Sequence, residues 1–196
     1  MIGAIVLAAG ASSRMGHPKA ELTIGAGGPT FLDAILASLD AAGVAAVRVV
    51  VSEESGRRRN GGVVNPNPAA GMLSSVHCGL RALPSGLDAV VLWPVDHPLV
   101  KPATVLAMIA AFRAGGAPIV VPTHDGRRGH PVLFAARVVP ELFGADASRG
   151  AAAVVRAHDD RLELAVTDRG VLHDIDTPED YARLAGATDR ASREAP

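Results

Sequence analysis

The sequence predicts an α/β fold: a single domain of Rossmann-like, three-layer α/β/α architecture with a mainly parallel sheet. Strand-like and helix-like segments alternate along the 196 residues, which is typical of βαβ units. The helical segments are roughly 10–13 residues long, the length of a crossover between parallel strands. The run Ala89–Trp93 is apolar throughout, as in a strand buried on both faces. We expect the domain to cover residues 1–186 and a flexible tail to follow at 187–196.

The first half of the chain opens with Ile2–Leu7, an apolar, β-prone run that ends at a glycine-containing loop. Thr30 is suited to cap a helix that starts at Phe31 and ends before Gly43, because its hydroxyl accepts from free N–H groups of the first turn. Met72–Leu83 carries Leu and Val at helical spacing and predicts a second helix. Two β-branched runs predict further strands: Ala46–Val51 and Gly62–Val64.

The second half continues the alternation after the buried strand at Ala89–Trp93. Pro102 fits the first turn of a helix over Pro102–Ala114, where a missing N–H has no cost. Four further strands are predicted: Pro118–Val121, Pro131–Phe134, Leu162–Val166 and His173–Ile175. Three further helices are predicted: Ala136–Leu142, Gly150–Ala157 and Thr177–Leu184.

Composition excludes several classes of protein. The net charge of -1 argues against a general electrostatic affinity for nucleic acid. The single cysteine, Cys78, excludes an internal disulfide and a cysteine-based zinc site. No apolar run approaches the about 18 residues of a membrane span, and the N-terminus lacks the basic region of a signal peptide. We expect a soluble cytoplasmic protein with neither a nucleic-acid nor a membrane partner.

The loop after the first strand has the features of a phosphate-binding loop. Small residues include Ser12 and Ser13, and two cations, Arg14 and Lys19, lie close by. Backbone N–H groups and cations can surround an anion there, since small side chains allow close approach. The spacing is not that of a P-loop. Ligands of parallel sheets sit beyond the carboxyl ends of the strands, so we expect the loops after Leu7, Trp93 and Phe134 to meet on one rim.

Acidic residues at two places suit a magnesium ion. Asp96 directly follows the buried strand and lies between prolines, so it is held rigidly at the rim; the alternative is that it caps the loop. In the predicted strand near the C-terminus, Asp174 and Asp176 share a face because strands have a period of two. Asp176 or Thr177 is suited to cap the last helix, and this role for Asp176 leaves Asp174 as the favoured second metal ligand.

Two further loops carry polar groups toward the same rim. Asn65 and Gly71 lead into a helix whose first turn holds Ser74 and Ser75, a site for a nucleotide or an anion, or an ordinary helix cap. Arg127, Arg128 and His130 precede a predicted strand, and His130 is either a ligand-binding or a structural histidine. No catalytic Ser-His-Asp order and no zinc-protease motif is present.

These residues together resemble the molybdenum cofactor nucleotidyltransferases, and most closely the CTP:molybdopterin cytidylyltransferases. The resemblance spans residues 2 to 185. It rests on Leu7–Gly10, Ser13–Gly16, Lys19, Pro94–Pro98, Gly129–Phe134 and Asp174–Asp180. The opening motif also resembles that of sugar-phosphate and methylerythritol phosphate transferases, so it indicates the reaction class more than the substrate. The family pattern differs at Val95, where Gly is usual, at His97, where Gln is usual, and across 144–150.

The resemblance implies Mg²⁺-dependent transfer of a nucleotide to a phosphomonoester such as molybdopterin, with release of pyrophosphate and a molybdoenzyme as a further partner. Ala9 implies CTP, since Gly there accompanies guanosine. The expected catalytic residues are Arg14, Lys19 and Asp96, with Asp96 and Asp174 as metal ligands. The expected nucleotide-binding residues are Leu7, Ala8, Ala9, Gly10, Ser12, Ser13, Arg14, Lys19, Asn65, Gly71, Ser74 and Ser75. The expected acceptor-binding residues are His97, Gly129, His130 and Pro131. Alternatives are a sugar- or polyol-phosphate nucleotidyltransferase and a non-catalytic chaperone that delivers a finished cofactor.

Overall fold

A computed structural model describes residues 1–10, 15–54, 62–146 and 149–184. In these residues, eight strands form one sheet in the order β3-β2-β1-β4-β7-β5-β6, and β8 pairs with the other edge of β5. The strands are β1 (Ile2–Ala8), β2 (Ala46–Ser52), β3 (Val63–Asn65), β4 (Ala89–Pro94), β5 (Ile119–His124), β6 (Arg127–Arg128), β7 (Val132–Ala135) and β8 (Leu162–Ala165). The α-helices are α1 (Phe31–Ala41), α3 (Met72–Ala82), α4 (Pro102–Gly115), α5 (Val139–Gly144) and α6 (Gly150–Ala157). The 3₁₀ helices are η1 (Lys19–Glu21), η2 (Pro68–Ala70), η3 (Ala136–Val138) and η4 (Arg169–Leu172).

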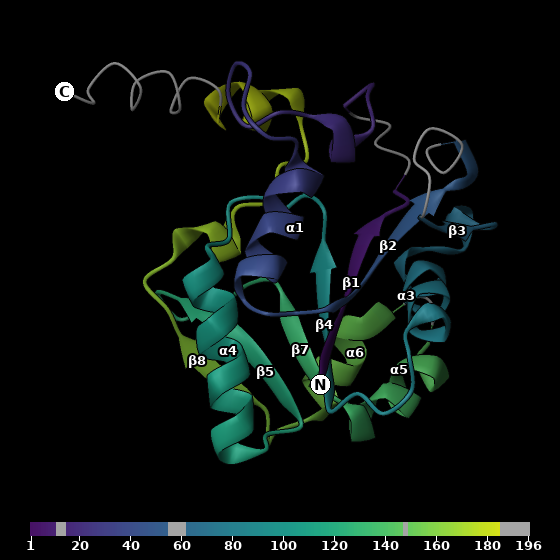
Figure 1. Cartoon of the computed structure of the whole chain (residues 1–196), viewed down its shortest axis with the longest axis vertical. Helices are drawn as coiled ribbons and strands as arrows, with labels where there is room; N and C mark the ends of the chain where they lie inside the picture. The colour runs from purple at the N-terminus through teal and green to yellow at the C-terminus, as the bar shows by residue number, and fades with distance from the viewer. Residues whose placement is uncertain (11–14, 55–61, 147–148, 185–196) are drawn as a thin grey trace.

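The three-layer α/β/α prediction is confirmed (Figure 1). Helices α1 and α4 contact each other over one face of the sheet, whereas α3, α5 and α6 contact one another on the opposite face. The core lies on both sides of β1 and β4, whose residues are almost entirely buried, with Trp93 at 0% exposure. Strands β1, β2, β3 and β4 are parallel, so their carboxyl ends meet at one edge of the sheet.

Local sequence accounts for the helices that flank this edge. Thr30 caps α1 as predicted, its hydroxyl accepting from the N–H of Asp33 at 3.1 Å. Helix α3 begins after Gly71, whose φ of 90° favours glycine. Gly79 lets the same helix pack closely on β1, because a Cβ there would lie 2.5 Å from Ile5 Cγ2. Both glycines therefore determine how α3 sits beside the sheet.

The prediction for the loop after Phe134 is wrong, because β7 runs antiparallel to β4. Ala135 pairs with Ala89, so the carboxyl end of β7 lies at the amino end of β4. A parallel β7 would need a crossover of a dozen or more residues after β5, and the connection through β6 is much shorter. The reversal brings Gly129–Pro131, which precede β7, to the edge where β1 and β4 end.

Two other elements differ from expectation. The predicted strand His173–Ile175 is an irregular extended segment after η4, attached to the loop after β4 by a bond from Ile175 N–H to the Asp96 carbonyl at 2.9 Å. The predicted helix Ala136–Leu142 is divided into η3 and α5, with Pro140 in the first turn of α5. Proline lacks an N–H and so cannot continue the preceding turn. The last helix is present over residues 178–184.

Candidate active site

A cavity of about 350 Å³ opens at the carboxyl ends of β1 and β4. Its walls come from five places in the chain that are far apart in sequence: the end of β1, η1, the turn from η2 into the start of α3, the loop after β4 and the segment after η4. The lining residues are Leu7, Ala8, Ala9, Gly10, Lys19, Pro68, Gly71, Met72, Ser75, Pro94, Val95, Asp96 and Asp176. Ser12, Ser13 and Arg14, which the sequence analysis assigns to the phosphate loop, lie outside the described residues.

Among the described lining residues, one cation and two carboxylates carry charge. Lys19 Nζ lies 3.4 Å from Asp96 Oδ2 and forms an ion pair with Asp176 Oδ1. The three side chains are 13%, 24% and 36% exposed, so water reaches them only in part. Burial raises the pKa of Asp96, but the hydrogen bond from His97 and the nearby positive charges outweigh it and hold that pKa below its ordinary value. Asp96 is therefore a carboxylate at neutral pH.

The structure separates the two aspartates that the sequence could not. Asp176 lines the cavity with Lys19, whereas Asp174 is exposed and lines a different cavity beside Arg183. The preference for Asp174 rested on Asp176 as the cap of the last helix, but Thr177 takes that position, its hydroxyl accepting from the N–H of Asp180 at 3.2 Å. The regular strand expected here would also have placed both aspartates on one face. The segment is irregular, and Ile175, 5% exposed, anchors it in the core, so the aspartates on either side point to different cavities.

His97 and His130 form the wall on the other side of Asp96. His97 Nδ1 donates to Asp96 Oδ1 at 2.8 Å, and the His97 carbonyl accepts from Trp93 Nε1 at 3.0 Å. The rings of His97 and His130 meet edge to face with their centroids 4.7 Å apart. Burial and the charge of His97 lower the pKa of His130 to about 4, so its ring is neutral at physiological pH. His97, only 8% exposed, is directed at Asp96 rather than at open solvent.

Gly129 brings His130 to this wall by a close backbone approach. A Cβ on Gly129 would lie 2.2 Å from the Val171 carbonyl oxygen, and the His130 N–H donates to that oxygen at 2.9 Å. Arg127 and Arg128 do not join them: both are exposed on β6, where Arg128 pairs with Glu163 of β8 at 2.7 Å. The expectation that two arginines lie near the rim is therefore wrong for the geometry observed.

The start of α3 closes the cavity on the remaining side. Gly71 and Ser75 line it, but Asn65 and Ser74 do not. Asn65 is 1% exposed and its amide donates to the hydroxyls of Ser74 and Ser75 at 2.8 and 2.9 Å. Asn65 and Ser74 thus hold Ser75 and the turn before α3 in position without lining the cavity themselves. Sequence reasoning missed Pro68 and Met72, although both belong to the turn-rich segment that it singled out.

Comparison with known proteins identifies this arrangement. Residues 4–162 match the MobA-like NTP transferase domain. The chain belongs to that family. A curated relative, the molybdenum cofactor guanylyltransferase of Sinorhizobium fredii, is 34% identical over 140 residues, which are 67% of this chain and 61% of the relative. The match thus spans less than two thirds of that relative's length.

Solved structures show the same MobA-like fold over nearly the whole chain. The crystal structure of Rv0371c from Mycobacterium tuberculosis H37Rv is 27% identical, with a TM-score of 0.78, and the match covers 95% of this chain and 98% of that one. A structure of Rv0371C in complex with manganese matches with the same identity and coverage and a TM-score of 0.74. The predicted family is confirmed by these comparisons.

The carboxylates of this MobA-like domain fit a divalent metal that is shared with a nucleotide. Among the described residues, no three His, Cys, Asp or Glu side chains come together as a complete metal site. Asp96 and Asp176 nevertheless offer hard oxygen ligands beside the same cavity. Mg²⁺ commonly takes one or two carboxylates and completes its coordination with substrate phosphates and water. The donor set therefore fits a metal that arrives with a triphosphate.

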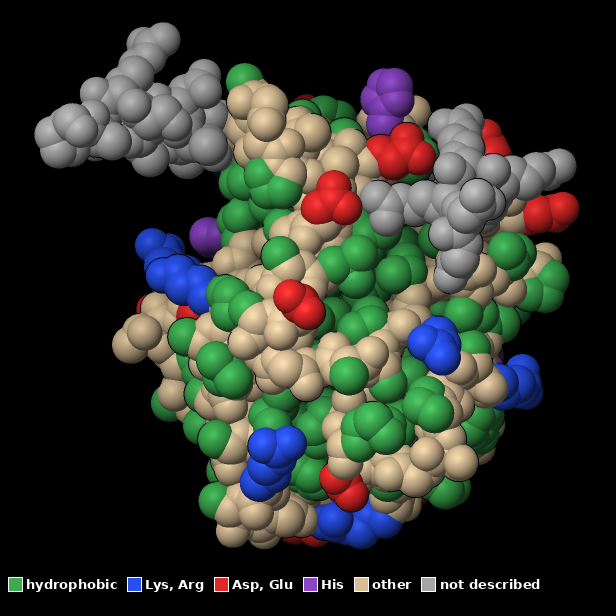
Figure 2. Space-filling view, in the orientation of Figure 1, with side chains coloured by type: hydrophobic (Ala, Val, Ile, Leu, Met, Phe, Trp, Pro, Cys, Tyr) green, Lys and Arg blue, Asp and Glu red, His purple; other side chains and the backbone are tan. Residues whose placement is uncertain are grey.

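On the face drawn in Figure 2, the described Lys and Arg side chains are dispersed among acidic and apolar ones rather than gathered into one basic patch. No helix in the described ranges is both long and apolar enough to cross a membrane.

Proposed function

We propose that this protein is a nucleotidyltransferase that transfers CMP from CTP to a phosphomonoester, with molybdopterin as the acceptor, and releases pyrophosphate. The observation that carries the proposal is the group Lys19, Asp96 and Asp176 beside a cavity at the carboxyl ends of β1 and β4. A non-catalytic delivery protein would not require metal-binding carboxylates next to a phosphate-binding lysine. Family membership supports the reaction class.

The reaction requires positioning and charge neutralisation more than a general base. An oxygen of the acceptor phosphate, already ionised near neutral pH, attacks the α-phosphorus in line; the new O–P bond forms as the bond to the β-phosphate oxygen breaks and pyrophosphate leaves. Lys19 and Arg14 neutralise the charge that accumulates on the phosphates. Asp96 and Asp176 would hold Mg²⁺, which would supply Lewis-acid stabilisation of the phosphate oxygens. Asp176 thus takes the role that the sequence analysis assigns to Asp174.

His130, Gly129 and Pro131 supply the acceptor side of the site. His130 is neutral, so it presents a hydrogen-bonding group without adding charge next to the metal carboxylates. This suits an acceptor that carries polar heteroatoms close to its phosphate. Because Nδ1 of His97 donates to Asp96, only the remaining edge of the His97 ring can contact the acceptor. The delivery of the product to a molybdoenzyme would follow release from this side.

The preference for CTP rests on Ala9. This residue lines the cavity and is 2% exposed, so its methyl group takes up room that a glycine would leave open. A cytosine ring needs less room than a guanine ring. The relative in Sinorhizobium fredii is named a guanylyltransferase, so GTP is the nucleotide to compare with CTP.

The test is pyrophosphate release with CTP, GTP, ATP and UTP, each with and without molybdopterin, in Mg²⁺ and in Mn²⁺. We expect release only when a metal, molybdopterin and a nucleotide are all present, with CTP the fastest. A panel of sugar and polyol phosphates in place of molybdopterin tests the alternative acceptors. Absence of release with every nucleotide and acceptor would remove the proposed activity.

A further inference from the structure

We propose that Lys19 has a second role as the internal counter-ion of the metal-binding carboxylates, and that this role makes metal and nucleotide bind cooperatively. The inference rests on the proposed function, because it takes Asp96 and Asp176 as the metal ligands. It adds to that function an energetic coupling between the two ligands. The coupling predicts that removing the Lys19 charge tightens the binding of metal alone. That result is not expected if Lys19 only bound phosphates.

The geometry shows where the charge of Lys19 lies before any ligand binds. Its ammonium contacts both carboxylates, with 3.4 Å between Nζ and Asp96 Oδ2 and an ion pair to Asp176 Oδ1. The side chain is only 13% exposed, so the charge is held against the carboxylates inside the cavity rather than out in solvent. A divalent cation on the same two carboxylates would meet a like charge within a few ångströms, at an effective dielectric well below that of water.

The affinity for the metal therefore differs between metal alone and metal with a triphosphate. To bind alone, a dication must compete with Lys19 for Asp96 and Asp176, and the displaced ammonium loses both anionic partners. When a triphosphate binds as well, its oxygens offer the ammonium new anions within the same cavity. The nucleotide thus raises the affinity for the metal, and by linkage the metal raises the affinity for the nucleotide by the same factor.

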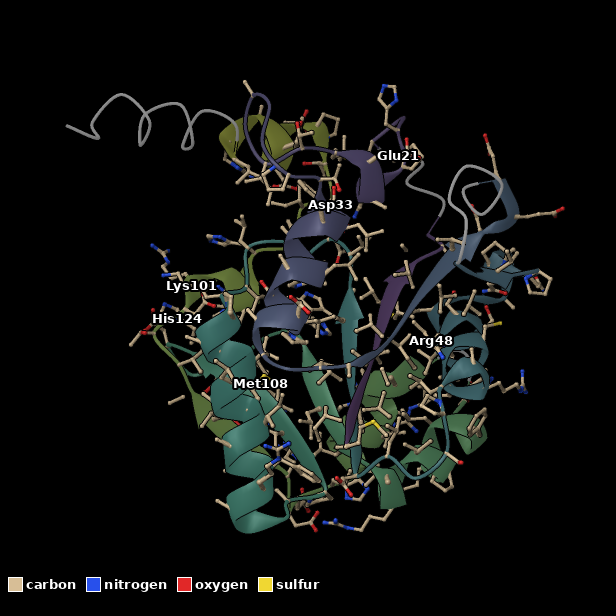
Figure 3. The ribbon with its side chains drawn as sticks, in the orientation of Figure 1. Glu21, Asp33, Arg48, Lys101, Met108 and His124 are labelled. Atoms are coloured by element: carbon tan, nitrogen blue, oxygen red, sulfur yellow. The ribbon has the colours of Figure 1, made fainter. Side chains whose placement is uncertain are left out.

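The chain offers a matched control, because it contains only two lysines, Lys19 and Lys101. Lys101 lies exposed before the first turn of α4, whereas Glu21, two residues after Lys19, lies with η1 near the start of α1 (Figure 3). Lys101→Met therefore changes the net charge by the same amount without touching the cavity. Lys19→Arg keeps the positive charge in the cavity. Asp96→Asn removes a proposed metal ligand, so the Mn²⁺ binding that it abolishes belongs to this site.

The experiment measures Mn²⁺ binding to the full chain by electron paramagnetic resonance of the free ion, with and without the non-reactive α,β-methylene analogues of CTP and GTP. In wild type we expect an analogue to tighten Mn²⁺ binding about tenfold or more. In Lys19→Met we expect Mn²⁺ alone to bind about tenfold more tightly than in wild type, and the effect of the analogue to shrink. Lys101→Met should behave like wild type, and Lys19→Arg, which keeps the positive charge in the cavity, should bind Mn²⁺ alone more weakly than Lys19→Met.

The outcomes separate this inference from the proposed function. If Lys19→Met binds Mn²⁺ alone no more tightly than wild type, the counter-ion role is overturned, while Asp96-dependent pyrophosphate release would leave the proposed function standing. If Asp96→Asn binds Mn²⁺ as wild type does, both fail. Should Lys19→Met not fold, lysine-selective ¹⁵N labelling of Lys101→Met leaves Lys19 as the single ammonium signal. That signal must shift when Mg²⁺ and an analogue are added together, and an unchanged signal overturns the inference.

Discussion

The backbone N–H of Ile175 donates to the carbonyl oxygen of Asp96 at 2.9 Å. This bond joins the loop after β4 to a segment 79 positions later in the chain and sets Asp176 against Lys19 beside Asp96. The position of the second carboxylate is therefore decided by a long-range backbone contact. Its neighbour Asp174 points to another cavity although it is only two residues away.

Replacing each aspartate of this segment separates their roles. Asp176→Asn removes a proposed metal ligand and a partner of Lys19, so we expect kcat/KM for nucleotidyl transfer to fall about 10²–10³-fold. Asp174→Asn, the matched control, should retain activity within a few-fold of wild type. Steady-state pyrophosphate release measures both. Loss of activity in Asp174→Asn with retention in Asp176→Asn would reverse the assignment.

The hydrogen bond from His97 orients Asp96, the proposed metal ligand. Nδ1 of His97 holds Oδ1, which leaves Oδ2 toward Lys19. His97→Leu should weaken metal binding in the presence of nucleotide about tenfold or more, as loss of an outer hydrogen bond to a ligand commonly does. His97→Gln, whose amide can donate to Asp96, should recover most of the affinity. Calorimetric titration with Mg²⁺ measures the difference, and equal affinity in both variants would contradict the orienting role.

The methyl group of Ala9 should set the preference between the two bases. In Ala9→Gly we expect the ratio of kcat/KM for GTP to that for CTP to rise about tenfold or more, in the range that one methyl-sized change in a pocket produces. The variant should keep the same dependence on metal and acceptor. Competition between CTP and GTP in one reaction, with both products quantified, gives the ratio directly. An unchanged ratio would remove Ala9 from base selection.

His158 links α5 to the loop after α6 and makes stability depend on pH. Its hydrogen bonds to Glu141, and then to Asp160, raise its pKa above the ordinary 6.5 in the folded protein. The stabilisation is therefore complete below about pH 6.5 and is lost as pH rises through the folded pKa. We expect Tm of wild type to decline over that window and His158→Asn to show a flatter profile. Thermal unfolding by circular dichroism between pH 5.5 and 8.5 tests this, and parallel profiles would contradict it.

Much of the fold could be predicted because it depends on local chemistry. The buried run at β4, the Thr30 cap and the proline at the start of α4 each follow from adjacent residues. Most predicted elements lie within a few residues of those observed, and the strand predicted at His173–Ile175 is the exception. The direction of β7 could not be read in this way. It depends on a connection too short for a crossover and on pairing with β4 and β5, which are distant in sequence.

The sequence by itself determined the α/β fold, the reaction class and the positions of Lys19 and Asp96, because strand patterning and motif spacing are local properties. Only the tertiary structure decided that Asp176 rather than Asp174 lies in the cavity, and that His97 is directed at Asp96. Those choices depend on where Ile175 and Trp93 anchor the backbone in the core. A side chain's direction at an irregular segment follows from such long-range contacts, which no local pattern records.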